Sequence, residues 1–325
     1  MIQAGIIGGA GYTAGELIRL LLVHSKVEIN FVFSTSSAGK KLSAIHQDLV
    51  GSTDQVFTDT IHTDVDILFL CLGHGNSKAF LEKTTFSSAT KIIDLSNDFR
   101  LSQDAVFQGK HFVYGLPELN TTAIQSAQYI ANPGCFATAI QLAILPLAAN
   151  GLIKDAIHVN AVTGATGAGT ALSATTHFTW RVDNFSHYKA FNHQHLGEIH
   201  QSVDSLQEGL QSKIHFIPNR GNFSRGIFAT LYTNYDGSLE AAKTLFKSYY
   251  KHAEFTTVSE DPLHLKQVVN TNKCLLHLEV HDGKLLITSA IDNLLKGASG
   301  QAVHNMNLMF GFEADLGLQL KANYF

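Results

Sequence analysis

The sequence predicts an α/β protein that combines a doubly wound parallel sheet domain with an α+β domain whose sheet is mostly antiparallel. Three observations predict this class. In the first part of the chain, short apolar runs alternate with segments of helical spacing, an order typical of parallel sheets. A glycine-rich turn separates the first apolar run from the first helical segment. Near the end, two apolar runs flank Asp282 and Gly283, a pair typical of tight hairpins between antiparallel strands.

Strands and helices alternate through the first half of the chain. Residues 2–7 form a short apolar run, residues 8–15 are glycine-rich, and residues 16–23 carry apolar side chains at helical spacing. Further buried strands are expected at 27–33, 65–72 and 91–95. Strands joined by helical crossovers pair in parallel, so we expect one parallel sheet here.

The character of the sequence changes after Cys135. A helix-like run extends from there to residue 149, a strand is expected at 157–162, and a glycine-rich loop covers 163–170. That loop is interpreted either as a contact to a ligand or as a plain turn. The remaining expected elements are hairpin strands at 275–280 and 284–291 and a closing helix at 301–312. We therefore expect a domain boundary near Cys135.

Composition and charge exclude several classes of protein. The 325 residues are 45% apolar and 15% charged, as in a packed globular protein. The net charge of -4 argues against a nucleic-acid partner. The richest apolar stretch, 140–149, is too short to span a membrane and contains Pro146. With no signal peptide visible and three widely spaced cysteines, we expect a reducing, cytoplasmic location.

Arginine is scarce, and each arginine is therefore a candidate for binding an anion. The guanidinium group matches the oxygens of a phosphate or a carboxylate. The five arginines are Arg19, Arg100, Arg181, Arg220 and Arg225.

The glycine-rich turn is the first candidate functional segment. Glycines between a strand and a helix let the backbone approach a pyrophosphate, which also meets the positive end of the helix. The spacing here is G-x-x-G-x-x-x-G rather than the commoner G-x-G-x-x-G. A tight turn that binds no ligand is the alternative interpretation. The candidate cofactor contacts are Gly8, Gly11, Tyr12, Thr13 and Ala14.

The segment after the second expected strand indicates which dinucleotide binds. Sites specific for NAD often place a carboxylate here, against the ribose 2′-hydroxyl. This sequence has small hydroxyl side chains instead, with Lys40 and Lys41 just beyond, and these suit a 2′-phosphate. We therefore expect NADP (NADPH) rather than NAD; the alternative is an ordinary solvated loop. The candidate contacts are Ser34, Ser36, Ser37 and Lys40.

Cys135 follows a turn and begins a helix. Asn-Pro-Gly at 132–134 enforces the turn, and an apolar helical run follows. A thiol at a helix N-terminus gains thiolate character from the macrodipole and from the N–H groups, which also stabilise an oxyanion. We therefore predict a nucleophile at Cys135, against the alternative of a small buried apolar residue. Cys71 and Cys274 lie inside apolar runs and are interpreted as core residues.

Titratable side chains are concentrated at residues 193–200. A thiol that attacks and later leaves needs a proton acceptor and donor with a pKa near neutrality. We predict that His195 has this role, oriented by Glu198 and with His193 beside it. Two alternatives stay open: a metal site made of these three residues and His200, and a solvated helix start in a chain with 17 histidines.

These segments, in this order, resemble the N-acetyl-gamma-glutamyl-phosphate reductase family, the arginine-pathway relatives of aspartate-semialdehyde dehydrogenase. The resemblance runs nearly end to end, and several collinear blocks of this length are specific together. The blocks are G-G-A-G-Y-T at 8–13, D-L-S-N-D-F-R-L at 94–101, Y-G-L-P-E-L at 114–119, N-P-G-C at 132–135, the glycine-rich loop at 163–169, the histidine block at 193–199, D-N-L-L-K-G-A-S-G-Q-A at 292–302 and N-M-N at 305–307.

The resemblance implies a reaction and assigns residues to it. It implies NADPH-dependent reduction of N-acetyl-L-glutamyl 5-phosphate to N-acetyl-L-glutamate 5-semialdehyde and phosphate, the third step of arginine biosynthesis. Cys135 matches the family's nucleophile and forms a thioester, and His195 matches its acid/base, with His193 and Glu198 adjacent. The further cofactor contacts are Gly73, Gly164 and Asn293. The substrate contacts are Arg100, for the phosphate, and Asn132. No metal is expected.

The resemblance also implies how the chain is organised. Residues 1–134 and 301–325 are expected to form a Rossmann-like NADP-binding domain, and residues 135–300 a catalytic, substrate-binding and oligomerisation domain. We expect a homodimer or homotetramer that acts on a small-molecule acyl phosphate, with no nucleic-acid or membrane partner.

Some positions depart from the family pattern. Gly73 stands where a proline is usual, Gln194 and Gly197 replace an arginine and a proline in the histidine block, and Thr170 replaces an arginine. Because two expected cations are missing, the sequence does not determine which acyl group the substrate nitrogen carries. The alternatives are an acyl-phosphate reductase for an N-succinyl, aspartyl or carrier-bound substrate, a zinc hydrolase that uses the histidine cluster, and a non-catalytic NADP sensor.

Overall fold

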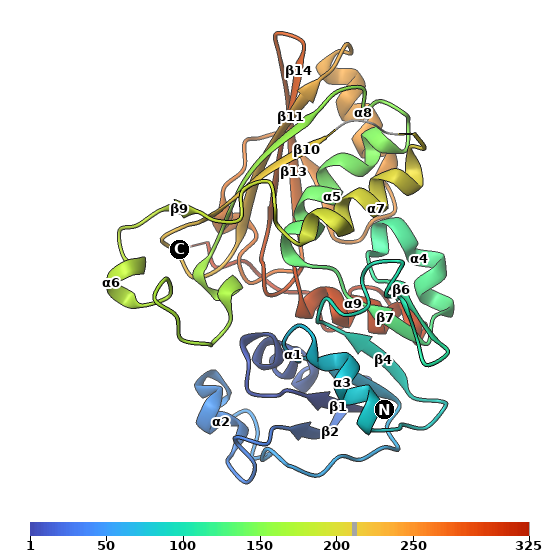
Figure 1. Ribbon diagram of the computed structural model, residues 1–325, viewed down its shortest axis with the longest axis vertical. Helices are drawn as coiled ribbons and strands as arrows, with labels where there is room; N and C mark the ends of the chain where they lie inside the picture. The colour runs from blue at the N-terminus through green and yellow to red at the C-terminus, as the bar shows by residue number, and fades with distance from the viewer. Residues whose placement is uncertain (210–212, 325) are drawn as a thin grey trace. The chain divides into compact units, whose positions relative to one another are not determined.

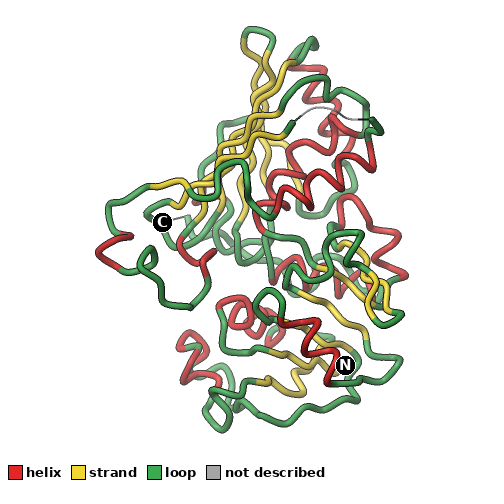
Figure 2. The backbone as a smooth tube through the Cα atoms, viewed as in Figure 1, coloured by secondary structure: helices red, strands yellow, loops and turns green. Residues whose placement is uncertain are grey.

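The computed structural model describes residues 1–209 and 213–324. They form two compact units, whose helices and strands are shown in Figures 1 and 2. Unit 1 comprises Met1–Pro133 and Ala298–Gln319, and unit 2 comprises Gly134–Gly297 and residues 320–324. The division expected from the sequence differs at the C-terminus, because it placed every residue after 300 in the first domain.

Unit 1 is built on a sheet with the strand order β2-β1-β3-β4-β7-β6-β5. Neighbouring strands pair in parallel except β5 and β6, which form an antiparallel hairpin. The predicted doubly wound parallel sheet is therefore confirmed. Its strands are β1 (Ile2–Ile7), β2 (Val27–Phe33), β3 (Ile67–Leu70), β4 (Lys91–Asp94), β5 (Val106–Phe107), β6 (Lys110–Tyr114) and β7 (Tyr129–Ala131). The helices of this unit are α1 (Tyr12–Leu22), α2 (Leu42–Ile45), η1 (Gln47–Leu49), α3 (Asn76–Lys83), α4 (Pro117–Ser126) and α9 (Ser299–Met309).

Buried apolar side chains hold the sheet of unit 1. All four residues of β3 are buried, as expected for a central strand covered on both faces. The rings of Phe99 and Phe112 stack with their centroids 4.0 Å apart inside the same core. Helix α1 buries Leu17, Ile18 and Leu21 at helical spacing and packs against α9. This packing fixes the glycine-rich turn that lies between β1 and α1.

Unit 2 is built on a second sheet with the order β12-β13-β14-β11-β8-β10-β9. The β12–β13 and β8–β10 pairs are parallel, and the other four pairs are antiparallel. The predicted α+β unit with a mostly antiparallel sheet is confirmed. Its strands are β8 (Ile157–Thr163), β9 (Ser186–His187), β10 (Ile214–Arg220), β11 (Ile227–Asn234), β12 (Thr256–Ser259), β13 (Cys274–His281) and β14 (Lys284–Ile291). The helices are α5 (Cys135–Ala148), η2 (Ala165–Ala168), α6 (Phe178–Arg181), α7 (His195–Leu206), α8 (Leu239–Tyr249) and η3 (Leu265–Gln267).

Helix α5 is the central helix of unit 2. Every residue from Phe136 to Ala148 is buried, because α5 packs against α7, α8 and the strands β11, β13 and β14. In Figure 1 the three helices lie together on one face of the sheet. Only the first residue, Cys135, is partly exposed. The start of α5 is therefore held firmly while its first side chain stays accessible.

The predicted hairpin is confirmed in detail. Strands β13 and β14 pair from Cys274 opposite Ile291 to His281 opposite Lys284. The two residues between them have left-handed backbone angles, with φ of 45° at Asp282 and 69° at Gly283, as a type I′ turn requires.

Several boundaries differ from those expected. Helix α1 begins at Tyr12 rather than at residue 16, because Gly8, with φ +81°, forms the turn and Gly15 continues the helix. Helix α9 covers Ser299–Met309 rather than 301–312. The helices α6 to α8 and the strands β9 to β12 lie in the part of the chain for which no element was predicted from the sequence. In the parts of the chain described, no helix has both the length and the apolar character needed to cross a membrane.

Candidate active site

Cys135 is the first residue of α5 and follows Gly134, which has an extended backbone with φ −72° and ψ 151°. Residues 132–134 form an extended connection from β7 to α5 rather than the predicted turn. Because Gly134 has no side chain, it cannot cap the N-terminus of α5. The positive end of the helix dipole is directed at the Cys135 side chain, where it stabilises negative charge.

His195 packs directly on Gly134. A Cβ atom at position 134 would lie 2.3 Å from Nε2 of His195, so only glycine fits there. His195 is itself the first residue of α7 and is 6% exposed. The glycine before the thiol thus provides the space in which the predicted acid/base histidine lies.

Glu198 links Gly134 to the imidazole of His195. Its Oε2 accepts the N–H of Gly134 at 2.9 Å, and its Oε1 lies 3.9 Å from Nε2 of His195. The carboxylate is 3% exposed. The carboxylate that the sequence placed beside His195 is therefore in position to orient the imidazole.

His193 has a different environment from His195. Its Nδ1 accepts the backbone N–H of His195 at 3.2 Å, and the two ring centroids are 4.6 Å apart. Burial and the nearby charge of Lys189 lower the pKa of His193 to about 4. His193 is therefore neutral at pH 7 and holds the backbone at the start of α7.

Tyr188 belongs to this cluster, although no sequence motif pointed to it. Its ring centroid lies 5.8 Å from that of His193, and Cζ of Arg220 lies 4.8 Å from the Tyr188 ring centroid. Burial and the charge of Cys135 raise the pKa of Tyr188 to about 12, while Arg220 acts in the opposite direction. A lone tyrosine in a loop carries no signal of its own, and only the fold brings it here.

The turn after β14 lies against the start of α5. A Cβ atom at Gly297 would come within 2.8 Å of Cβ of Cys135. The Gly297 N–H bonds to the carbonyl of Asp292 at 2.9 Å, and the Asp292 carboxylate pairs with Arg225 at 3.0 Å. This turn fixes one wall beside the thiol. Sequence reasoning treated Gly297 only as a residue ahead of the closing helix.

Asn293 holds the glycine-rich loop of unit 2. Its Oδ1 accepts the N–H of Gly226 at 2.7 Å, and its Nδ2 donates to Oγ1 of Thr166 at 3.1 Å. Gly164 bonds to the carbonyl of Gly226 and packs so closely on Ser224 that a Cβ atom would clash. The predicted cofactor contacts Gly164 and Asn293 therefore lie in one connected network.

In unit 1 the glycine turn leaves the N-terminus of α1 open. Gly8 has φ +81°, and a Cβ atom there would lie 2.6 Å from the carbonyl oxygen of Cys71. Gly11, the residue before α1, has no atom within 4 Å of its would-be Cβ. Tyr12 is 44% exposed, and Ala14 is fully buried. An open helix N-terminus formed by glycine and backbone N–H groups suits a pyrophosphate.

The loop after β2 is partly buried and partly exposed. Ser34 and Ser37 are buried, whereas Ser36 and Lys40 are exposed. Lys41 forms a 2.7 Å ion pair with Asp54, a residue that is distant in the sequence. The fold thus brings one acidic group near the loop, already paired with a lysine.

Arg100 and Asn132 are buried and make internal hydrogen bonds. Arg100 donates from Nε to the carbonyl of Asn132 at 2.8 Å and from Nη2 to that of Leu95 at 3.0 Å. The Asn132 amide donates to the carbonyl of Ala298 and accepts from Asn305, each at 3.0 Å. Both side chains fix the loops after β4 and β7, and their roles as substrate contacts stay predictions.

A buried carboxylate lies at the C-terminal end of β4. Asp94 accepts hydrogen bonds from the hydroxyls of Ser77 at 2.6 Å and Ser96 at 2.7 Å. Burial raises the pKa of Asp94 to about 6 in spite of these bonds. The predicted contact Gly73 is exposed and follows β3, the strand that pairs with β4.

The alternative of a metal site has no support in the geometry. Across residues 1–209 and 213–324, no three His, Cys, Asp or Glu side chains are grouped so that they could hold a metal ion. His193, His195, Glu198 and His200 are therefore close in sequence without forming a ligand set.

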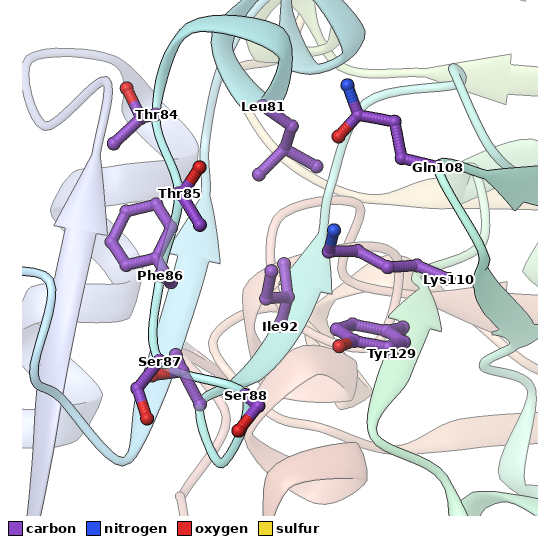
Figure 3. A pocket seen from close by; sticks show the side chains of 11 residues that line it. Leu81, Thr84, Thr85, Phe86, Ser87, Ser88, Ile92, Gln108, Lys110 and Tyr129 are labelled. Carbon is purple, nitrogen blue, oxygen red and sulfur yellow. The ribbon is translucent and has the colours of Figure 1, made fainter.

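A cavity of about 200 Å³ lies in unit 1. Lys110 of β6, Tyr129 of β7 and Ile92 of β4 border it, and the segment 84–88 closes it (Figure 3). No predicted catalytic or cofactor residue lines this cavity. The arrangement around Cys135 is thus the stronger candidate for chemistry.

Two family models match most of the chain. Residues 3–127 match the model described as "Semialdehyde dehydrogenase, NAD binding domain". Residues 135–293 match the model described as "Semialdehyde dehydrogenase, dimerisation domain". The border between the two matches falls just before Cys135.

Curated relatives match the whole chain. An N-acetyl-gamma-glutamyl-phosphate reductase of Christiangramia forsetii is 65% identical, and one of Flavobacterium johnsoniae is 59% identical, each over 100% of both chains. Among solved structures, aspartate semialdehyde dehydrogenase II of Vibrio cholerae, complexed with ASA, matches with a TM-score of 0.71 and 16% identity over 96% of this chain and 98% of that one. Aspartate semialdehyde dehydrogenase with NADP from Candida albicans matches with a TM-score of 0.69 and 14% identity over 95% and 98%. These structures share the fold.

Proposed function

This chain belongs to the N-acetyl-gamma-glutamyl-phosphate reductase family, and from that premise we propose that it reduces an N-acyl-glutamyl 5-phosphate to the 5-semialdehyde with NADPH, releasing phosphate. N-acetyl-L-glutamyl 5-phosphate is the proposed substrate. The observation that carries this proposal is the contact between His195 and Gly134, the residue that directly precedes Cys135. This contact supports a reaction in which the proposed nucleophile Cys135 and the proposed base His195 act at a helix N-terminus.

In the proposed first step, the Cys135 thiolate attacks the acyl carbon and phosphate leaves. The start of α5 supports this step, since its dipole favours the thiolate and its N–H groups stabilise the oxyanion that forms. The product is a thioester on Cys135. Because α5 is buried along its length, the sulfur is held in one place for both steps.

In the second step, the thioester carbon would gain a hydride, and its oxygen would take from His195 the proton that the Cys135 thiol had lost, which gives a thiohemiacetal. His195 then takes the hydroxyl proton, the carbon–sulfur bond breaks, and the aldehyde leaves while Cys135 is regenerated. Glu198 supports this role of His195 through its 3.9 Å approach to the imidazole. His193 is the weaker candidate base, because its low pKa leaves it a poor proton acceptor at pH 7.

The residues of unit 1 fit the cofactor. The open N-terminus of α1 after Gly11 suits the pyrophosphate, and the hydroxyls of Ser34 and Ser36 with the exposed Lys40 suit the 2′-phosphate. When bound, NADPH supplies the hydride. The chain's own part is to bind and orient it.

We also propose that the protein works as a homodimer or homotetramer in the cytoplasm. Exposed apolar side chains are concentrated in one segment of unit 2, namely Leu172, Phe178, Trp180, Phe185 and Phe191. Apolar surface of this kind favours burial against another protein surface. The match of this unit to a dimerisation domain supports a second copy of the chain as the partner.

The test is phosphate-dependent reduction of NADP by the purified protein, with N-acetyl- and N-succinyl-glutamate 5-semialdehyde assayed separately. Turnover that requires phosphate supports the reaction class, and the preferred compound identifies the acyl group. If neither compound is turned over by a protein that binds NADPH, the proposed substrate is wrong. Aspartate semialdehyde and carrier-bound semialdehydes are then the compounds to assay.

A further inference from the structure

Two of the five arginines lie side by side in unit 2. Arg181 ends α6 and Arg220 ends β10. Nη2 of Arg181 donates to the carbonyl of Arg220 at 3.3 Å and to that of Asn184 at 2.7 Å. Burial lowers the pKa of Arg181 most, and the positive charge of Arg220 lowers it further. The two guanidinium groups are thus close enough to repel each other.

The donors of this pair are only partly used. Arg181 is 8% exposed, yet its Nε and Nη1, and Nε of Arg220, are buried and have no hydrogen-bond partner. Within residues 1–209 and 213–324, no carboxylate forms an ion pair with either arginine. By contrast, Arg225 pairs with Asp292, and Arg19 pairs with Glu16. Buried, unsatisfied donors and like charges are both costly, so this arrangement suits a bound anion.

A series of ring contacts links the pair to the residue before Cys135. Cζ of Arg220 lies 4.8 Å from the ring centroid of Tyr188. The Tyr188 ring lies 5.8 Å from His193, which lies 4.6 Å from His195. His195 in turn packs on the residue before Cys135. The arginines therefore lie at the far end of the cluster that begins at the nucleophile.

We propose that Arg181 and Arg220 form the subsite for a carboxylate of the substrate. This proposal rests on the proposed function. The phosphate leaves in the first step, whereas the rest of the substrate stays attached to Cys135 through the second step. A subsite that serves both steps must hold a group that remains, and a carboxylate matches two guanidinium forks through paired N–H···O bonds.

Two carboxylates are possible occupants. The α-carboxylate is present on every N-acyl-glutamyl substrate, whereas a terminal carboxylate on the acyl group is present only on an N-succinyl substrate.

The test compares Arg220→Gln and Arg181→Gln with the unchanged protein on N-acetyl- and N-succinyl-glutamate 5-semialdehyde. We expect KM to rise roughly 10- to 100-fold with kcat changed by less than about threefold, because a charge-assisted pair is lost from binding. A rise for both compounds assigns the α-carboxylate, and a rise for the N-succinyl compound alone assigns the acyl carboxylate. A KM within about twofold of normal for both compounds overturns the proposal. Lys247→Gln removes an exposed cation from α8 and is the matched control.

Binding separates this proposal from the proposed reaction. The unreactive acids N-acetylglutamate and N-succinylglutamate are titrated calorimetrically into the unchanged protein and both Gln variants. If the protein turns over neither semialdehyde but loses acid binding in the variants, the subsite is supported and the reaction is wrong. Equal acid binding by all three proteins overturns the subsite. If Arg220→Gln does not fold, Arg220→Lys replaces it in the test, because lysine keeps the charge but loses the planar fork. This variant is expected to weaken acid binding to a smaller degree. Unchanged acid binding by Arg220→Lys overturns the proposed subsite.

Discussion

The site residues of unit 2 and those of unit 1 are built in different ways. Around Cys135, buried side chains hold the backbone in place: His195 lies on Gly134, Oε2 of Glu198 accepts the Gly134 N–H, and Nδ1 of His193 accepts the His195 N–H. In unit 1 the predicted cofactor contacts are glycines, backbone N–H groups and the side chains of a loop that is exposed in part. Chemistry that forms and breaks bonds needs fixed side chains. Binding of a dinucleotide needs mainly backbone shape and an open helix end.

This difference predicts where substitutions act. Changes around Cys135 should lower kcat and leave NADPH affinity intact, because they alter the reacting groups. Changes in the loop after β2 should alter NADPH affinity and leave kcat intact, because they alter only binding.

The largest effect is expected for Cys135→Ser. The serine hydroxyl is a much weaker nucleophile than the thiolate, so turnover should fall at least about 1,000-fold. NADPH binding, followed by fluorescence titration, should stay unchanged. Cys274→Ser is the matched control, since Cys274 is buried in β13 beside Ser289. Activity of the Cys135 variant near the normal rate would refute a covalent intermediate.

The next largest effect is expected for His195→Asn. Loss of the acid/base should lower kcat by roughly 100-fold, whereas His193→Asn should lower it by less than about tenfold. Steady-state kinetics of the two variants measure the difference directly. The reverse order would assign the proton transfer to His193.

Gly134→Ala tests the contact on which the cluster depends. The added Cβ would lie 2.3 Å from Nε2 of His195, so the imidazole has to move away from the thiol. A displacement of about 1 Å should cost roughly 100-fold in kcat or somewhat less. Circular dichroism and NADPH titration serve as controls for folding and cofactor binding. An unchanged kcat would show that the position of His195 is unimportant.

The sequence was informative where one local pattern carries the function. The Asn-Pro-Gly-Cys segment, the glycine loop and the histidine block are each continuous, and each lies at the expected end of a strand or helix. Tyr188, Gly297 and the Arg181–Arg220 pair were missed as neighbours, because strands and loops that are distant in the sequence bring them together. Arg100 and Asn132 are held in internal hydrogen bonds, and their roles as substrate contacts stay predictions.

A smaller effect is expected in the loop of unit 1. Lys40→Glu places a negative charge beside the proposed 2′-phosphate site and should raise KM for NADPH about tenfold, with KM for NADH unchanged. Lys41→Glu is the control, because Lys41 is already paired with Asp54. Equal effects of Lys40→Glu on NADPH and NADH would contradict the proposed position of the phosphate.

The smallest effects concern the pH dependence of folding stability. His193 in unit 2 and Asp94 in unit 1 are expected to change this stability in opposite directions as pH falls. His193 has its pKa lowered from 6.5 to about 4 in the folded chain. The unfolded chain therefore binds more protons between these values, and stability falls as pH falls through that window. Asp94 has its pKa raised from 3.8 to about 6 in the folded chain. The folded chain therefore binds more protons at this residue between these values. The contribution of Asp94 to the stability of the folded chain is complete at low pH and is lost as pH rises toward 6.

Thermal unfolding of two variants between pH 4 and 7 measures these contributions. His193→Asn should flatten the loss of stability on acidification, because the proton uptake of the unfolded chain at this residue is removed. Asp94→Asn should make that loss steeper, because an opposing contribution is removed. Parallel curves for both variants and the unchanged protein would show that neither group is linked to folding.

The covalent role of Cys135 is tested most directly by single-turnover oxidation without phosphate. The protein is mixed with N-acetyl- or N-succinyl-glutamate 5-semialdehyde and NADP, NADPH formation is followed, and the quenched protein is digested and its peptides are weighed. We predict one equivalent of NADPH per active chain and an acyl adduct on the peptide that contains Cys135. An active protein that forms NADPH without an adduct, or that carries the adduct on Cys71 or Cys274, would contradict the account.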